Sequence, residues 1–145
     1  MTQAPTFWDA TALVPLCVNE AASRRAHAQL GRSEPVVWWF SIVEIQSAIC
    51  RLHRERAVTE RERRGAERRM QVLRDGWKEI LPEDSILERA LQLLAIHPLR
   101  AGDSLQLAAA LAWCGERPAG RPFISGDRRL CVAARISGFT VVELT

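Results

Sequence analysis

Hydrophobic positions along the chain alternate between short continuous apolar runs and stretches with helical spacing. The run at residues 35–40 is uninterrupted, as expected for a strand that is covered on both faces. From Ser41 onward, apolar residues recur on one stripe at Ile42, Ile45 and Ile49, which predicts a helix. The whole pattern predicts strands at 6–8, 35–40, 77–81, 122–125 and 140–144, and helices at 13–30, 41–52, 59–76, 86–94, 103–114 and 127–137.

This order of elements predicts an α/β fold, a three-layer α/β/α sandwich with a mostly parallel central sheet. Right-handed crossovers place helices on both faces of such a sheet. The helix at 103–114 has the most regular apolar pattern. Its uninterrupted apolar run, residues 107–114, is far shorter than the ~18 to 20 residues that span a bilayer.

Length and composition are those of one globular domain. The chain has 145 residues, of which 48% are hydrophobic and 26% charged, which excludes long disorder and a coiled-coil rod. No basic residue precedes Arg24, so the start does not resemble a secretory signal and we expect a cytoplasmic protein. The four cysteines are predicted to be buried thiols in a reducing compartment: Cys17, Cys50, Cys114 and Cys131. Only Cys50 and His53 lie close together, so no zinc site is expected.

The positive charge is concentrated in one segment. Residues 51–74 hold nine arginines against four glutamates, whereas the whole chain carries a net charge of only +3. A basic stripe on a helix is typical of a nucleic-acid partner, and the guanidinium group suits phosphate. The candidate RNA-binding residues are Arg51, Arg54, Arg64 and Arg68. The alternative is a solvated helix with Glu–Arg pairs along it.

Four acidic residues stand where a carboxylate is costly. Asp9 and Asp127 each follow an expected strand, Glu44 lies within an apolar segment, and Asp103 opens an apolar helix. Each has a structural explanation as a helix cap. Ser41 and Glu44 match the capping-box spacing, and the three aspartates stand at N-cap positions.

The expected topology favours a shared site over four separate caps. The carboxyl ends of parallel strands and the N-termini of the following helices meet at one edge of a sheet. Four carboxylates there would repel one another unless a cation held them. Oxygen ligands without His or Cys nearby favour Mg²⁺ or Mn²⁺, which can activate water and neutralise a phosphodiester. Thr11, Ser104 and Ser125 lie within two residues of these acids and are predicted to support them, although ordinary turn or cap hydrogen bonds would also explain them.

These segments resemble the acidic motifs of PIN-domain ribonucleases, in the same order. The matching stretches are Asp9-Ala10-Thr11-Ala12-Leu13, Glu44 after a strand, Asp103-Ser104-Leu105-Gln106-Leu107-Ala108-Ala109-Ala110 and Ser125-Gly126-Asp127-Arg128-Arg129-Leu130. The small size is most similar to the VapC-like toxins of type II toxin–antitoxin pairs. The resemblance extends from Asp9 to the closing strand.

The resemblance implies a single PIN-like ribonuclease domain over residues 1–145, with Mg²⁺- or Mn²⁺-dependent endonucleolytic cleavage of RNA. It also implies a homodimer and a cognate antitoxin that blocks the active site. Asp9 and Asp103 would be the firmest metal ligands, with Glu44 and Asp127 completing the catalytic quartet directly or through water. The arginine-rich segment is not a family signature, so RNA and the antitoxin are both candidates for it.

Two other functions compete with this one. A non-catalytic PIN-like module that binds RNA or protein would show no metal dependence and a salt-sensitive affinity. A phosphotransfer receiver or an aspartate-nucleophile phosphatase usually needs a lysine near the carboxylate, and the only lysine, Lys78, is poorly placed. Phosphate-binding loops of the G-x-x-x-x-G-K or G-x-G-x-x-G type do not occur. The five tryptophans are expected in the core or at a subunit interface.

Overall fold

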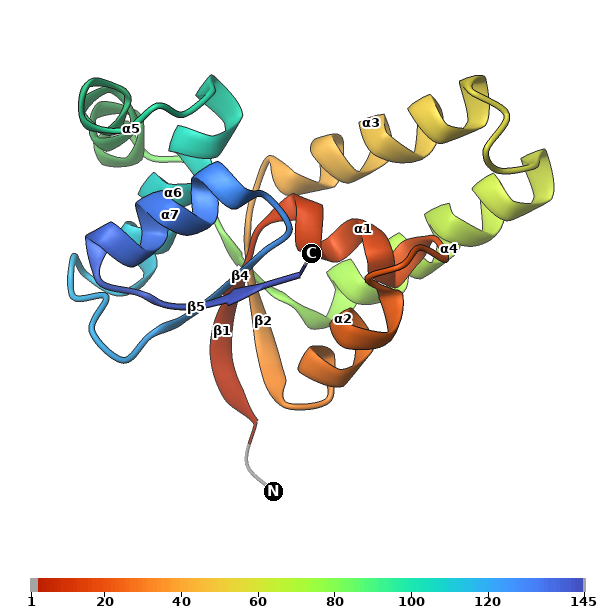
Figure 1. The fold of residues 1–145 in the computed structure, drawn as a ribbon, viewed down its shortest axis with the longest axis horizontal. Helices are drawn as coiled ribbons and strands as arrows, with labels where there is room; N and C mark the ends of the chain where they lie inside the picture. The colour runs from red at the N-terminus through yellow and green to blue at the C-terminus, as the bar shows by residue number, and fades with distance from the viewer. Residues whose placement is uncertain (1–2, 145) are drawn as a thin grey trace.

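The computed structural model describes residues 3–144 and contains one five-stranded sheet (Figure 1). The strands are β1 (Ala4–Trp8), β2 (Ser33–Trp38), β3 (Lys78–Ile80), β4 (Pro122–Ser125) and β5 (Thr140–Glu143). Their order is β3-β2-β1-β4-β5, and every pairing in this part of the chain is parallel. The carboxyl ends of all strands therefore meet at one edge of the sheet.

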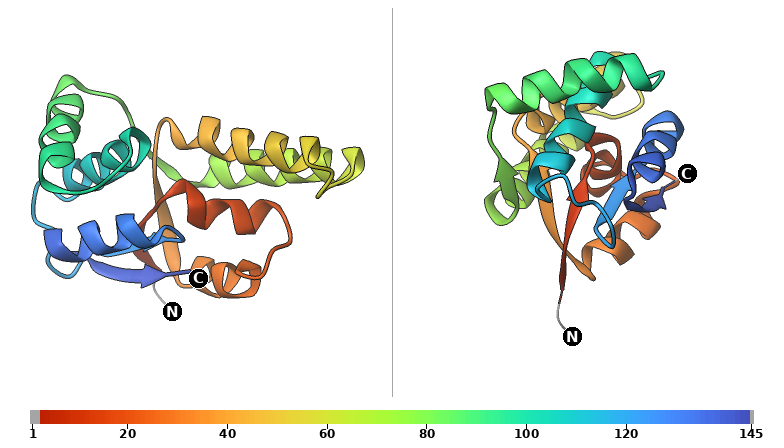
Figure 2. Two further views of the ribbon diagram at one scale, coloured as in Figure 1. Left: turned by 45° about the horizontal axis from the view of Figure 1, so that its top comes forward. Right: turned by 90° about the vertical axis from the view of Figure 1, so that its left-hand side faces the viewer.

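Helices cover both faces of the sheet, as Figures 1 and 2 show, so the three-layer α/β/α fold is confirmed. One layer holds α1 (Ala10–Cys17), α2 (Ser23–Leu30), α3 (Ser41–Arg54) and α4 (Glu60–Gly76), and the other holds α5 (Asp84–Ile96), α6 (Ala101–Trp113) and α7 (Arg128–Ser137). None of the helices within residues 3–144 combines the length and apolarity needed to cross a bilayer.

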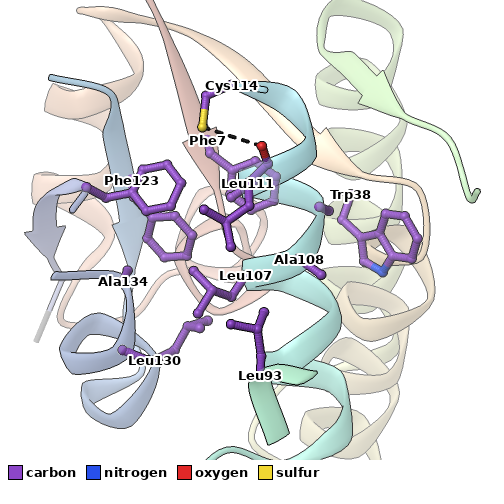
Figure 3. Close-up of a cluster of buried hydrophobic side chains, with 14 of the residues drawn as sticks. Phe7, Trp38, Leu93, Leu107, Ala108, Leu111, Cys114, Phe123, Leu130 and Ala134 are labelled. Carbon is purple, nitrogen blue, oxygen red and sulfur yellow. Dashed lines mark hydrogen bonds between the residues drawn. The ribbon is translucent and has the colours of Figure 1, made fainter. Parts of the chain in front are cut away.

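The strands contribute side chains to two hydrophobic cores, because neighbouring side chains along a strand point to opposite faces of the sheet. Phe7 and Phe123 pack into the core under α5–α7, whereas Trp8 and Ile124 pack into the core under α1–α4. Figure 3 shows Leu111 of α6 near the rings of Phe7 and Phe123, with Leu107 one turn along the helix near Leu130. The rings of Phe7 and Phe123 stack with their centroids 5.3 Å apart. Sequence reading therefore identified the right apolar runs, and the pleat of the strands divides them between two layers.

The expected helix at 13–30 is two helices, which corrects the sequence prediction. Val18 is extended, and α2 does not begin until Ser23. The Ser23 hydroxyl closes the turn by accepting from the Glu20 N–H at 2.8 Å and donating to the Val18 carbonyl at 3.0 Å. This local hydrogen bonding replaces the helical ladder across residues 18–22.

The strand expected at 35–40 also ends earlier, at Trp38. Its neighbour β3 is only three residues long, so the ladder has no partner beyond the bond from the Trp39 N–H to the Ile80 carbonyl. The aromatic side chains of Trp39 and Phe40 are consequently 43% and 41% exposed. Trp8, Trp38 and Trp77 are buried, as expected for core packing.

The arginine-rich helix begins as the sequence predicted. Thr59 is the N-cap of α4 and forms a complete capping box with Glu62. The cysteine prediction also holds in the described residues, where all four thiols are free and three are buried, with Cys50 half-buried. Helix α6, by contrast, begins at Ala101, two residues before Asp103.

Candidate acidic active site

Asp9 is the most deeply buried of the four acidic residues, with only 2% of its surface exposed. It directly follows β1, and its backbone carbonyl accepts from the Ala12 N–H, but its carboxylate caps nothing. Instead Oδ2 accepts hydrogen bonds from the hydroxyls of Thr11 and Ser125, the latter at 2.8 Å. The sequence-based cap explanation is therefore wrong for this side chain. Its carboxylate is held between two strand ends.

The pKa of Asp9 is raised to about 6, chiefly by burial; the hydrogen bonds from Thr11 and Ser125 lower it in part, and the charges of Asp103 and Asp127 add to the increase. A carboxylate in water would have a pKa near 3.8. The cause is chiefly lost hydration. A buried acid with two hydroxyl donors and two acidic neighbours has the surroundings of a cation ligand or an acid–base group.

Glu44 extends from the first turns of α3 toward α6. Its Oε1 accepts from the Gln106 Nε2 at 2.8 Å, and the same amide donates to the Ser41 hydroxyl oxygen at 2.8 Å. Burial, and then the charges of Asp9 and Asp103, raises the pKa of Glu44 to about 7. The predicted Ser41–Glu44 capping box is absent, because Phe40 is the N-cap and Ser41 is engaged by Gln106.

Asp103 lies in the first turn of α6, but it is not the N-cap that the sequence suggested. Arg100 occupies that position. Burial raises the pKa of Asp103, and so does the charge of Asp127, while Arg100 and Arg129 lower it. Asp103 therefore interacts electrostatically with Asp127, which follows β4, and with Arg100 and Arg129.

Asp127 is the one acid whose predicted cap is confirmed. Its Oδ1 accepts from the Leu130 N–H at 2.9 Å at the start of α7. Its charge also raises the pKa values of Asp9 and Asp103. Capping and electrostatic coupling to the site thus coexist in one side chain.

Two hydroxyls tie the segments together. The Gly126 N–H donates to Thr11 Oγ1 at 2.9 Å, and the Asp127 N–H donates to Ser125 Oγ at 2.9 Å. Thr11 and Ser125 therefore connect the end of β1 to the end of β4 through Asp9. Ser104 differs, because its buried hydroxyl donates to the Ala101 carbonyl within its own helix, the ordinary explanation considered above.

The donor chemistry fits a hard divalent cation, because the four acids supply only oxygen and their mutual repulsion would be relieved by positive charge. Their separate hydrogen bonds hold them apart, however. Among residues 3–144, no three His, Cys, Asp or Glu side chains already surround one point as metal ligands do. The four acids form an electrostatically coupled group whose catalytic and metal-binding roles remain predictions.

The four candidate RNA-binding arginines do not form one surface around the acids. Arg51 borders a hollow of about 290 Å³ that Thr11, Glu20 and Glu44 also line. Arg68 lines a different hollow, with Leu16 and Val72, between α1 and α4. Arg54 and Arg64 are exposed. Of the four, Arg51 is the one that lines a hollow together with an acid of the site, Glu44.

Sequence reading undervalued Gln106, and it gave no role to Gly102, Arg100 or Arg129. Gln106 stood in the sequence only as part of the matching stretch that begins at Asp103, yet its side chain is fully buried against Glu44. A polar residue between Leu105 and Leu107, inside an apolar helix, was the available signal. Nothing in the sequence pattern identified the two arginines as neighbours of Asp103.

No protein-family model and no curated protein matches the sequence. Several solved structures share its fold, among them the following three. A chain of a toxin–antitoxin complex from Klebsiella pneumoniae has 16% identity and a TM-score of 0.66, over 97% of this chain and 98% of the other. PAE2754 from Pyrobaculum aerophilum has 18% identity and a TM-score of 0.60, over 96% and 90%. FitAcB from Neisseria gonorrhoeae has 11% identity and a TM-score of 0.65, over 93% and 96%.

At these identities the likeness concerns architecture, and it covers nearly the full length of each chain. The parallel sheet, the two helical layers and the acidic edge agree with the fold inferred from the sequence motifs. The chain therefore has the three-layer PIN-like fold, shared with solved proteins that include a chain of a toxin–antitoxin complex.

Proposed function

We propose that this protein is a Mg²⁺- or Mn²⁺-dependent endoribonuclease that acts in the cytoplasm as the toxin of a toxin–antitoxin pair. The observation that carries the proposal is that Asp9 and Asp103 each interact electrostatically with the other and with both Glu44 and Asp127 at the carboxyl edge of the sheet. These residues come from four distant segments of the chain. Their shared location is what the PIN resemblance requires.

The chain's own groups would divide the work as follows. When bound, Mg²⁺ or Mn²⁺ supplies Lewis-acid chemistry that activates water and neutralises phosphodiester charge. Thr11 and Ser125 both donate to Asp9 Oδ2, which leaves Oδ1 without a hydrogen bond among residues 3–144 and open to a cation. Asp103, Glu44 and Asp127 provide the remaining carboxylates, and Arg51 provides positive charge at the border of the site for RNA phosphates.

The test is cleavage of RNA by purified protein. We expect cleavage with Mg²⁺ or Mn²⁺ and none with EDTA, in preparations where an Asp9→Asn variant purified in parallel is inactive. Activity that survives both EDTA and this substitution would come from a contaminant or another site, and would refute the proposal.

The absence of three gathered ligands among residues 3–144 favours a second candidate, a non-catalytic PIN-like module that binds RNA or protein. Calorimetry of the metal-free protein separates the two. A nuclease of this kind binds Mn²⁺, and Asp103→Asn weakens that binding. A module that only binds its partner takes up no Mn²⁺ and binds RNA with an affinity that falls steeply with salt.

The antitoxin partner is supported by the neighbouring solved complexes and by a surface between α1, α2 and α4. Two adjoining hollows there share Leu16, His27 and Arg69. Val72, on the rim, is 71% exposed. Arginine beside exposed apolar side chains suits an acidic, amphipathic protein segment better than an RNA backbone, which offers no apolar face. We therefore propose this surface for the antitoxin and the Arg51 border for RNA.

The homodimer is supported by apolar side chains near β3 and α5. Leu87 and Leu91 are 56% and 62% exposed, one turn apart on α5. Leu87 also lines a hollow of about 260 Å³ with Trp38 and Leu105. Analytical ultracentrifugation tests this surface. Leu87→Arg should give monomers, whereas Val72→Arg, at an exposed apolar position on α4, should leave the dimer intact.

A further inference from the structure

Gln106 is a buried side chain whose hydrogen bonding is only half satisfied. It has no exposed surface, and both protons of Nε2 are used, one toward Ser41 Oγ and one toward Glu44 Oε1, each at 2.8 Å. Its own Oε1 is buried and has no hydrogen-bond partner among the described residues. An unpaired buried carbonyl is unfavourable. If this position served only to fill the core, an apolar residue such as methionine would be more stable there than Gln106.

The orientation of the amide follows from its neighbour. A carboxylate only accepts hydrogen bonds, so the Nε2 end of Gln106 must face Glu44 while Glu44 is ionised. Glu44 is a long side chain on the first turns of α3 and would otherwise sample several rotamers. The bond from Gln106 therefore fixes one oxygen of Glu44 relative to α6.

Gly102, on the preceding turn of the same helix, leaves space for the other oxygen of Glu44. A Cβ atom built on Gly102 would lie 3.3 Å from Glu44 Oε2, which is tighter than ordinary van der Waals contact. Glycine at this helical position leaves room for the carboxylate at a cost in helix propensity. Gly102 and Gln106 are four residues apart, so both lie on the face of α6 that meets Glu44.

We propose that Gln106, together with Gly102, positions the Glu44 carboxylate for the divalent cation of the acidic site, an inference that rests on the proposed function. Helix α6 thus contributes to the site in two ways, through residues that lie within little more than one turn. It supplies Asp103 to the site, and it orients Glu44, which arrives from α3 on another layer. Gln106 and Gly102 act through Glu44 and are positioning residues.

The test measures Mn²⁺ affinity by calorimetry on metal-free protein. Gln106→Met keeps the volume and removes the donor, and we expect roughly tenfold weaker binding, the lower end of the loss seen when partners of metal ligands are removed. In a Glu44→Ala background the same substitution should not weaken Mn²⁺ binding further, because the carboxylate through which Gln106 acts is absent. Gln46→Met is the matched control, since Gln46 bonds to Glu67 and Cys50 and should leave Mn²⁺ affinity unchanged.

Gly102→Ala is an independent test, because we expect it to affect thermal stability and Mn²⁺ affinity in opposite directions. Alanine favours the helix, so the thermal midpoint should stay or rise, while the displaced carboxylate should bind Mn²⁺ more weakly. Gly76→Ala, where a Cβ meets nothing within 4 Å, is the control. A merely structural role for either residue would lower the thermal midpoint and spare the affinity.

Three outcomes would overturn the inference. If wild-type protein binds Mn²⁺ and both variants bind it equally well, the positioning role is wrong while the proposed function stands. An equal loss of affinity with and without Glu44 would show that Gln106 does not act through it. If wild-type protein binds no Mn²⁺, the proposed function fails and this inference fails with it.

Discussion

The carboxyl edge of the sheet and the α3–α4 hairpin are both rich in charge, yet they hold it in opposite ways. At the edge, Asp9 is buried and bonded to Ser125, 116 positions away in the chain. In the hairpin, Arg63 is paired with Glu60 and Glu67, within one turn of its own helix. Figure 1 shows the hairpin extending away from the sheet.

The comparison teaches that the density of charge along a sequence is a poor guide to its importance. Local pairs on an exposed helix contribute little to stability, because water and salt screen them. A few carboxylates held away from water by the fold store far more electrostatic free energy. Substitutions at the carboxyl edge should therefore have larger effects than substitutions in the α3–α4 hairpin.

Replacing Asp9 by asparagine should abolish RNA cleavage. We expect at least a hundredfold loss in rate, the scale of a lost metal ligand. The fold should survive, because the amide oxygen still accepts from Thr11 and Ser125. The control is Asp75→Asn at an exposed position on α4, which should cleave like wild type. Equal rates for the two variants would remove Asp9 from the site.

Stability should depend on pH through the buried acids. Folding raises the pKa of Asp9 to about 6 and that of Glu44 to about 7, so the folded state binds more protons than the unfolded state between about pH 4 and 7. Without divalent ions, the free energy of unfolding should therefore fall as the pH rises from about 4 to about 7. For Asp9 alone the expected change is on the order of 3 kcal/mol.

Urea unfolding at pH 4.5 and pH 7.5 measures this effect, and saturating Mg²⁺ should reduce it by stabilising the ionised carboxylates. In the Asp9→Asn variant the dependence should be smaller. A free energy that rises over the same range would mean that the edge carboxylates are stabilised by folding.

Removing the Ser125 hydroxyl should reduce cleavage roughly tenfold, because Asp9 then loses one of its two donors. The structure also predicts that Ser125→Ala loosens the β4–α7 turn, where this hydroxyl accepts from the Asp127 N–H. Ser137→Ala is the control, since that hydroxyl donates only within α7. Cleavage assays at saturating Mg²⁺ compare the two, and equal rates would contradict the role of Ser125.

Single arginine substitutions should separate the two partners. Arg51→Ala removes a cation from the hollow that Glu44 also lines and should weaken RNA binding a few-fold, with a smaller salt dependence. Arg68→Ala should instead weaken antitoxin binding and spare RNA cleavage. Fluorescence anisotropy with a short RNA and with the antitoxin measures both. If each variant affects both partners alike, the hairpin is one undivided basic surface.

The smallest effect is expected for the cap of α4. Thr59→Ala breaks the capping box with Glu62 and should cost about 1 kcal/mol of stability. Cleavage should be unchanged, because the capping contacts join only Thr59 and Glu62 and touch none of the four acids. A large loss of activity from this variant would show that the hairpin and the edge are coupled.

Sequence alone determined the element types, the parallel architecture and the order of the acidic motifs, because these depend on local periodicity and chain order. It also located the cap at Asp127 correctly, and it placed the start of the arginine-rich helix at Thr59, which is the N-cap of α4. Local patterns failed where a partner from elsewhere competes. The capping box at Ser41 is lost to Gln106, 65 positions away, and the strand at 35–40 ends where β3 ends.

Only the tertiary structure decided which charges are buried and what holds them. Periodicity cannot show that Gln106 faces Glu44, that Arg129 approaches Asp103, or that Arg51 and Arg68 border different hollows. The physical reason is that pKa values and hydrogen bonds depend on distance and exclusion of water. Both are set when separate layers pack, and neither is written in the spacing of residues along the chain.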